Sequence, residues 1–101
     1  MQVIVDLCVI PIGAGVSVAA EIAECQRILQ QFPIKTQLHA YGTNLEGTWD
    51  DVMAAVKACH ERLHQQGTIR LSSTLKIGTR VDKSQTMVDK IGRVERQLLD
   101  D

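Results

Sequence analysis

The chain has 101 residues, about the modal size of one domain, so we expect a single domain with one core over residues 1–101. Its formal net charge is −1 and it holds one Phe, one Tyr and one Trp, which argues against nucleic-acid binding because that function needs clustered basic residues or exposed aromatic rings. The three cysteines are odd in number and set in apolar stretches, and no apolar run is long enough to cross a bilayer, so we expect a reduced cytoplasmic protein without a membrane partner.

A strand and an amphipathic helix come first. Residues 2–11 are mostly apolar and β-branched and run into glycines, which is typical of a strand followed by a loop. Ser17 is a plausible helix N-cap, and apolar residues then recur at helical spacing as far as Phe32. Pro33 ends this pattern because proline lacks the amide proton that a helix interior requires. We therefore expect a strand at 2–11 and a helix at 18–32.

Two strands and a second helix follow. Residues 34–41 alternate between apolar and polar side chains, and Gly42 permits a tight connection to a short strand at 43–47. Thr48 is a plausible N-cap of the second helix, with Asp51 as its partner in a capping box. Apolar residues at helical spacing then supply the buried stripe of that helix.

The last third of the chain predicts one more strand and one more helix. Gly67 suits the C-terminal cap of the second helix, and residues 69–77 alternate as in a half-buried strand. Apolar residues at helical spacing from Met87 to Leu98 mark the last helix, interrupted only by Gly92. The predicted fold is α+β: a ferredoxin-like βαββαβ sandwich with an additional C-terminal helix, in which a four-stranded antiparallel sheet carries two helices on one face.

One face of the predicted sheet is left free of helices. Side chains alternate along a strand, so the first strand contributes a second set of residues to this open face: Ile4, Asp6, Cys8 and Ile10. The other strands add a mainly polar set: Lys35, Gln37, His39, Tyr41, Asn44, Glu46, Ser72, Thr74 and Lys76. A central strand that is apolar on both faces favours cover on both faces. A partner subunit is the simplest cover, and a small-molecule pocket lined by subunits fits the same residues.

A zinc-protease pattern occurs in the second predicted helix. Residues 60–64, His-Glu-Arg-Leu-His, fit H-E-x-x-H, but position 70, where a third histidine would complete the extended form, is Arg. Both histidines lie on the flank of the apolar stripe, where amphipathic side chains commonly border a core. The cysteines have no sequence-local base either. We therefore expect no metal site, no resident cofactor and no catalytic residue.

Polar and aromatic side chains gather around the predicted turn at residues 39–51. This segment contains an imidazole, two threonine hydroxyls, an amide, carboxylates and the single Trp, in a chain that is poor in aromatics. Composition alone leaves two interpretations open, a binding segment or a hairpin with a helix cap and an anchoring Trp. Residues 79–83, Thr-Arg-Val-Asp-Lys, likewise allow a solvated loop or an anion-binding corner.

Three stretches that span the chain form a pattern together: Val9-Ile-Pro-Ile-Gly13, His39-Ala-Tyr-Gly-Thr-Asn-Leu-Glu-Gly-Thr-Trp-Asp-Asp-Val-Met53 and Lys76-Ile-Gly-Thr-Arg-Val-Asp-Lys83. In these stretches the chain resembles the small thiamine-binding protein family of bacteria, archaea and yeast. The resemblance implies a ferredoxin-like fold and assembly into dimers or tetramers through the sheets. It also implies binding of thiamine or its hydroxymethylpyrimidine part without known catalysis, so we do not expect an enzyme.

The resemblance implies a ligand site around the turn, made by His39, Thr43, Glu46 and Trp49. Thiamine combines an aminopyrimidine, which pairs with a carboxylate or hydroxyl, with a permanently cationic thiazolium. Glu46 or Asp6 could hydrogen-bond the pyrimidine edge and offset the charge. Trp49 or Tyr41 could face the cation, at a gain of about 0.5 to 2 kcal/mol.

Two alternatives stay open from the sequence. Arg80 and Lys83 would hold either an anion or a carboxylate of another subunit. The alternative to thiamine binding is an oligomeric regulatory or interaction module, in which the open face serves only assembly.

Overall fold

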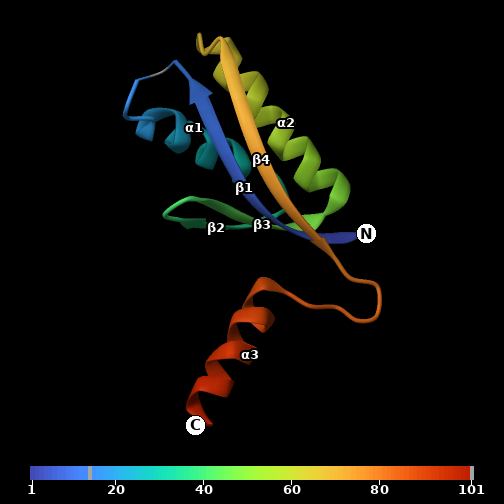
Figure 1. Cartoon of the computed structure of the whole chain (residues 1–101). Coiled ribbons are helices and arrows are strands. Elements are labelled where there is room, and N and C mark those ends of the chain that lie inside the picture. Colours follow the sequence, from blue (N-terminus) through green and yellow to red (C-terminus); the bar gives the residue numbers. More distant parts are fainter. Residues whose placement is uncertain (14, 101) are drawn as a thin grey trace.

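The chain folds into one four-stranded antiparallel sheet with two helices against one of its faces, and a third helix stands apart (Figure 1). The computed structural model describes residues 1–13 and 15–100. The elements are β1 (Gln2–Ile12), α1 (Ala19–Leu29), β2 (Lys35–His39), β3 (Gly42–Thr48), α2 (Trp49–Gln65), β4 (Arg70–Thr79) and α3 (Met87–Leu99). The strand order is β2-β3-β1-β4. This arrangement confirms the predicted α+β, ferredoxin-like fold with its additional C-terminal helix.

The side chains of β1 alternate between a helix-covered face and an open face, as predicted. Val3, Val5 and Leu7 point under the helices and are at most 2% exposed. The strand register gathers the other set on what we call the open face: Ile4, Asp6, Cys8, Ile10, Ile12, Lys35, Gln37, His39, Asn44, Glu46, Ser72, Thr74 and Lys76. The open face therefore combines an apolar stripe along β1 with polar groups from its neighbours.

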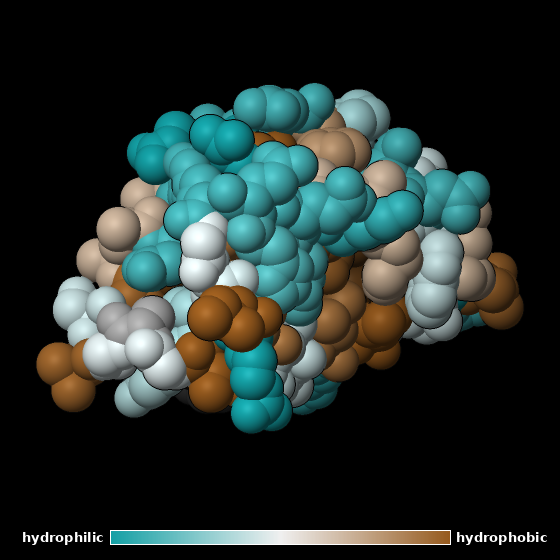
Figure 2. Space-filling view, turned by 90° about the horizontal axis from the view of Figure 1, so that it is seen from above, coloured by the Kyte–Doolittle hydropathy of each residue, from teal (hydrophilic) through white to brown (hydrophobic). Residues whose placement is uncertain are grey.

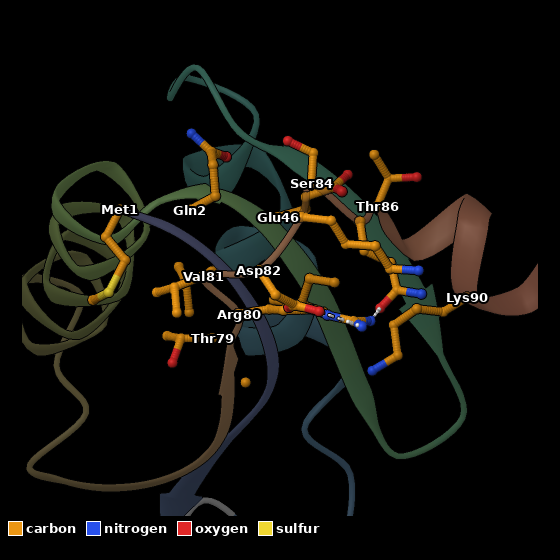
Figure 3. Close-up of a pocket in the computed structure, with 15 residues that line it drawn as sticks. Met1, Gln2, Glu46, Thr79, Arg80, Val81, Asp82, Ser84, Thr86 and Lys90 are labelled. Carbon is orange, nitrogen blue, oxygen red and sulfur yellow. Dashed lines mark hydrogen bonds and ion pairs between the residues drawn. The ribbon is translucent and has the colours of Figure 1, made fainter.

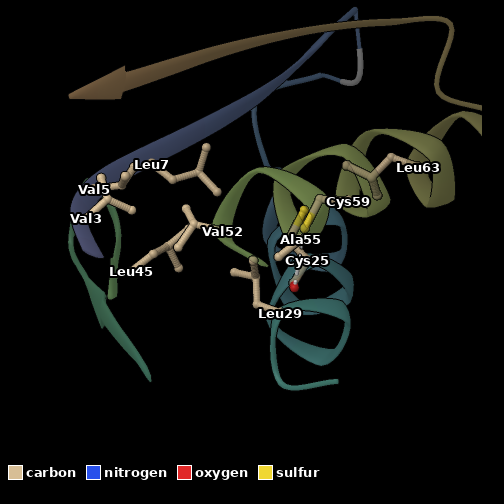
Figure 4. Close-up of a cluster of buried hydrophobic side chains, with 10 residues drawn as sticks. All are labelled: Val3, Val5, Leu7, Cys25, Leu29, Leu45, Val52, Ala55, Cys59 and Leu63. Carbon is tan, nitrogen blue, oxygen red and sulfur yellow. Dashed lines mark hydrogen bonds between the residues drawn. The ribbon is translucent and has the colours of Figure 1, made fainter. Parts of the chain in front are cut away.

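The core lies between the covered face and the two helices (Figure 4). It is aliphatic apart from two thiols, and its buried members are Val3, Val5, Leu7, Cys25, Leu29, Leu45, Val52, Ala55, Cys59 and Leu63. Cys25 and Cys59 are free thiols where α1 packs on α2, and the Cys59 thiol donates to the Cys25 carbonyl oxygen at 3.7 Å. These two cysteines behave as small buried hydrophobes, whereas Cys8 is half-buried on the open face.

The first helix differs from the sequence prediction at both ends. Its N-cap is Val18, with no side-chain cap bond, so the prediction of Ser17 at this position was wrong. The helix ends at Leu29 rather than Phe32 because the chain leaves the helix through turns, in which the Phe32 amide donates to the Leu29 carbonyl at 3.3 Å. The loop before the helix holds Gly13 and Gly15, both with positive φ, and Ala14 between them lies outside the described residues.

Both ends of α2 follow the predicted capping chemistry. The Thr48 hydroxyl accepts a hydrogen bond from the Asp51 amide at 3.1 Å. At the other end Gly67 takes φ +107°, and the Thr68 amide donates to the Leu63 carbonyl at 3.0 Å, which is the bonding pattern of a glycine-terminated helix. The full reciprocal capping box occurs in α3 instead, between Thr86 and Asp89.

Apolar side chains also reach the surface. Figure 2 shows brown patches between polar side chains on the side of the molecule seen from above. Among the described helices, α1, α2 and α3 all fall short of the length and apolarity that crossing a membrane requires.

Candidate functional site

A groove of about 1040 Å³ lies along one end of the open face (Figure 3). Its walls are Met1 and the first residues of β1, Glu46 of β3, the segment 78–86 from the end of β4 onward, and Lys90 of α3. We call it the Glu46 groove. Its volume slightly exceeds the usual range of ligand pockets, about 300 to 1,000 Å³, and four separate parts of the chain contribute to it.

Glu46 is the carboxylate of this groove and is half-buried. Its Oε1 accepts a hydrogen bond from the Met87 amide at 3.1 Å, at the start of α3. The strand register sets Ile4 beside it on β1. Among the ion pairs of the described residues, none involves Glu46. One carboxylate oxygen is thus held by the backbone, and the negative charge of the group is available to a cationic or hydrogen-bonding ligand.

The segment after β4 is shaped by Arg80. Its guanidinium donates to the Asp82 carboxylate through two nitrogens, with Nη2 to Oδ2 at 2.8 Å, and a third nitrogen donates to Gln85 Oε1 at 3.0 Å. This contact lowers the pKa of Asp82 to about 2 and raises the pKa of Arg80. Arg80 therefore orders its own loop, while Lys83, the other predicted anion or subunit contact, lines the same groove and is exposed.

Asp6 and His39 form a second polar group on the open face. His39 Nε2 lies 2.8 Å from Asp6 Oδ1, and His39 Nδ1 accepts the Tyr41 amide at 3.2 Å. Because Nδ1 accepts a hydrogen bond, the proton of the neutral ring is on Nε2, which donates to Asp6. Gly42 stands between the two side chains, and a Cβ there would collide with the Leu7 carbonyl oxygen and approach Asp6 Oδ1 to 3.1 Å. Only glycine leaves room for this contact.

A smaller cavity of about 250 Å³ adjoins this pair. Its walls are mainly apolar side chains of β1, α1 and the β2–β3 turn, together with His39 and Thr43. Thr43 is only 4% exposed, and its hydroxyl accepts the Gln26 side-chain amide of α1 at 2.9 Å. Thr43 thus faces the helices rather than the open face.

The structure therefore divides the predicted ligand residues into separate places. Asp6 and His39 meet beside Gly42, whereas Glu46 shares its groove with Arg80 and Lys83. The two places are adjacent on the open face, because the register sets Glu46 opposite Ile4 and Asp6 is the next open-face residue of β1. Trp49 begins α2, is 37% exposed, and its amide donates to the Met1 carbonyl at 2.8 Å. It is not among the residues that line either cavity.

Sequence reasoning did not find Lys90, Ser84 and Thr86 as groove residues. A signal was available, because Thr86-x-x-Asp89 is a capping-box pattern that places a helix start directly after the Arg80 loop. That helix start brings Lys90 to the groove.

The H-E-x-x-H histidines have local partners. His60 Nε2 meets the Ser73 hydroxyl of β4, and His64 Nδ1 lies 2.7 Å from the Thr68 carbonyl oxygen. Their ring centroids are 6.4 Å apart. His60 is half-buried at the border of the core, as expected, whereas His64 is exposed.

Comparisons with known proteins identify the family of this chain. The thiamine-binding protein family matches residues 5–95. A UPF0045 protein of Synechocystis sp. is 54% identical over 97% of this chain and 81% of its own length. A UPF0045 protein of Eremothecium gossypii is 35% identical over 99% of this chain and 96% of its own length.

Solved structures show the same fold. A hypothetical protein of Methanocaldococcus jannaschii superposes with a TM-score of 0.86 at 30% identity, over 93% of this chain and 96% of that one. A proposed thiamine biosynthesis/salvage protein of Thermotoga maritima gives a TM-score of 0.80 at 20% identity, over 93% and 99% of the two chains, a likeness that shows the fold alone. On the match over residues 5–95 and these relatives, the chain belongs to the thiamine-binding protein family.

Proposed function

We propose that this chain binds thiamine or its hydroxymethylpyrimidine part in the Glu46 groove, without catalysing a reaction on it. The observation that carries the proposal is the Glu46 carboxylate, which lies in the groove with one oxygen held by the Met87 amide at 3.1 Å. An oriented carboxylate accepts the hydrogen bonds of an aminopyrimidine and offsets the charge of a thiazolium. Membership of the thiamine-binding family supports the same ligand class.

The remaining walls suit the other parts of such a ligand. Ile4 and Met1 offer apolar surface to a flat ring, and Ser84 and Thr86 offer hydroxyls. Lys83 and Lys90 are exposed cations at the groove, where they can contact the hydroxyl or phosphate at the far end of the bound ligand.

The absence of catalysis is part of the proposal. The described lining of the groove contains no histidine and no cysteine, the side chains that most often supply a base or nucleophile near neutral pH. We further propose that the protein acts as a homo-oligomer, a dimer or tetramer, in the cytoplasm, where its three free thiols stay reduced.

Calorimetric titration with thiamine, thiamine diphosphate and hydroxymethylpyrimidine tests the ligand. Glu46→Gln removes the charge but keeps an amide oxygen for the Met87 amide, so the fold is preserved. We expect the affinity to fall by tenfold or more, because a hydrogen bond to a charged group contributes about 1.5 to 3 kcal/mol. Glu61→Gln, on the exposed side of α2, is the matched control and keeps the wild-type affinity. No heat with any of the three compounds would contradict the proposal.

Asp6→Asn tests the position of the ligand. The Asp6–His39 pair is the other carboxylate site on the open face. If Asp6→Asn weakens binding and Glu46→Gln does not, the pyrimidine lies near Gly42 rather than in the Glu46 groove.

A second candidate function rests on a different observation. Helix α3 presents exposed apolar side chains and stands apart from the sheet, which favours an interaction module. In that case Glu46→Gln leaves every titration unchanged while the oligomeric state still depends on α3.

A further inference from the structure

Two cysteines meet in the core where α1 packs on α2 (Figure 4). Cys25 belongs to α1 and Cys59 to α2, and both are free thiols. The Cys59 thiol donates to the Cys25 carbonyl oxygen at 3.7 Å. Neither residue lines the Glu46 groove or the smaller cavity. The pair is therefore a set of neighbouring nucleophiles that ligand binding leaves unused.

The contact between the helices is close enough for a bond between the two sulfur atoms. The Cys59 thiol already reaches the backbone of α1, and Ala55, one turn before it on α2, is fully buried at the same contact. Packed helices lie about 8 to 10 Å apart, and each Cα atom lies about 2.3 Å from its axis. Facing Cα atoms are then roughly 3.5 to 5.5 Å apart, which overlaps the range of about 4.4 to 6.8 Å for a disulfide.

The two thiols differ in their acidity and in their access to solvent. The Cys59 thiol lowers the pKa of Cys25 by hydrogen bonding, whereas the same interaction, together with burial, raises the pKa of Cys59. Cys25 is 5% exposed and Cys59 is 0% exposed. Because the thiolate is the nucleophile in thiol oxidation, Cys25 is the thiol that reacts first. Cys59 is placed to resolve the product.

The contact also holds the helix that has less support at its start. Helix α1 has no side-chain cap, follows a loop that contains glycines with positive φ, and packs chiefly on α2. Val18 at its start and Ile22 line the smaller cavity. Gln26, the neighbour of Cys25, donates to the buried Thr43 hydroxyl. A covalent link at Cys25 would therefore fix one wall of the smaller cavity.

We propose that Cys25 and Cys59 are a redox modification site, at which hydrogen peroxide converts the two thiols into an intrachain disulfide that joins α1 to α2. A small uncharged oxidant fits the buried position of the pair. This proposal does not depend on which ligand the Glu46 groove binds.

The oxidation takes place in two steps. The Cys25 thiolate attacks one peroxide oxygen, the O–O bond breaks, and the other oxygen leaves as hydroxide and takes up the Cys25 proton, so that Cys25 becomes a sulfenic acid and one water forms. The Cys59 sulfur then attacks the sulfenic sulfur, the S–O bond breaks, and the hydroxyl leaves with the Cys59 proton as a second water. One peroxide accepts two electrons and two thiols become one disulfide.

The disulfide stabilises the folded chain by constraining the unfolded one. It joins residues 34 positions apart, and closing a loop of this length removes conformational freedom from the unfolded state. The cytoplasm reduces exposed disulfides, and dithiol reductants reverse this oxidation. The cross-link is thus a transient state that forms while peroxide is present and fixes α1 on α2.

Peroxide treatment of the reduced full chain, followed by alkylation in denaturant and peptide mapping, tests the bond. We expect two protected cysteines in the wild type, found in one cross-linked peptide that joins Cys25 to Cys59 and that dithiothreitol separates. Cys8→Ala is the matched control, because it removes the third thiol and should leave the cross-link intact. A wild type in which all three cysteines remain alkylated, or in which Cys8 is the protected partner, overturns the proposal.

Cys59→Ala tests the order of the two steps. Without the resolving thiol, Cys25 should stop at the sulfenic acid, which dimedone traps as an adduct on the Cys25 peptide. Cys25→Ala should give neither the cross-link nor an adduct at Cys59. An adduct at Cys59 in the Cys25→Ala variant, with none at Cys25 in the Cys59→Ala variant, would reverse the assigned roles and contradict the mechanism.

Thermal unfolding of the Cys8→Ala variant before and after oxidation tests the effect on the fold. The Tm should rise by about 10 °C or more, since a disulfide that spans a loop of this length is strongly stabilising in a chain of this size. Dithiothreitol should restore the original Tm, and amide exchange in α1 should slow only in the oxidised form. A cross-linked form with an unchanged or lower Tm would show that the bond does not hold α1 in its folded position, and the proposed role would be wrong.

Discussion

His39 and Asp6 are in contact at 2.8 Å although their strands, β2 and β1, are not neighbours in the sheet. The strand between them, β3, contributes Gly42 at this point, opposite His39. The missing side chain of Gly42 lets the imidazole cross β3 and reach the carboxylate. The turn segment thus joins three strands on the open face through a polar contact that depends on one glycine.

Gly42→Ala should destabilise the protein. The added Cβ would collide with the Leu7 carbonyl oxygen and crowd Asp6, and overpacking of this kind costs about 1 to 3 kcal/mol. Urea unfolding measures the loss. Gly78→Ala is the control, because its Cβ would meet only the Ile4 carbonyl oxygen at 3.9 Å. Equal stability of both variants would show that the close approach at Gly42 is absent.

Thr43→Val should lower the free energy of unfolding by about 1 kcal/mol. The hydroxyl accepts the Gln26 amide under the helices, and a typical internal hydrogen bond contributes about that amount. Thr43→Ser keeps the hydroxyl and should lose less, in the same urea experiment. A valine variant as stable as wild type would exclude this structural role for Thr43.

Arg80→Ala should raise the pKa of Asp82. The Arg80 guanidinium holds that pKa at about 2, below its ordinary value of 3.8. Because the pKa of Asp82 is lowered in the folded state, the contact stabilises the ordered loop when the pH is above the ordinary pKa of 3.8. This stabilisation is lost as the pH falls toward 2 and Asp82 is protonated. Titration of the Asp82 carboxyl carbon by NMR checks the shift. Lys83→Ala removes only a weaker Coulombic attraction to Asp82 and should raise its pKa less. Equal shifts in both variants would contradict the bidentate contact.

Leu63→Ala should be among the most damaging single changes. Leu63 is 1% exposed in the core, and truncation of a buried leucine costs about 2 to 5 kcal/mol. Leu38→Ala, at a position that is 60% exposed on β2, should change stability by less than about 0.5 kcal/mol. Thermal or urea unfolding of the pair measures the contrast, and a small loss at Leu63 would place it outside the core.

Local patterns account for the elements and for which face each strand residue takes. Alternation along β1 placed Asp6 on the open face, and the same rule placed Glu46 there from β3, because the period of two is a property of the extended backbone. The end of α2 at Gly67 followed from a similarly local rule. Ser17 shows the limit, since a capping residue near a helix start is only a preference and the helix begins one residue later.

Contacts between segments that are distant in the sequence could not be predicted from these local patterns. The sequence shows that Glu46, Arg80 and Lys83 carry charge, but not that β4 and its loop bring them to one groove, since that depends on strand order and on how the loop is held. Thr43 belongs to the same motif as His39 yet faces the opposite side of the sheet. The apolar stripe of α3, which runs from Met87 to Leu98, is visible in its spacing, because helical periodicity is local. Its exposure emerges only after folding, because it depends on every other surface that the chain has already covered.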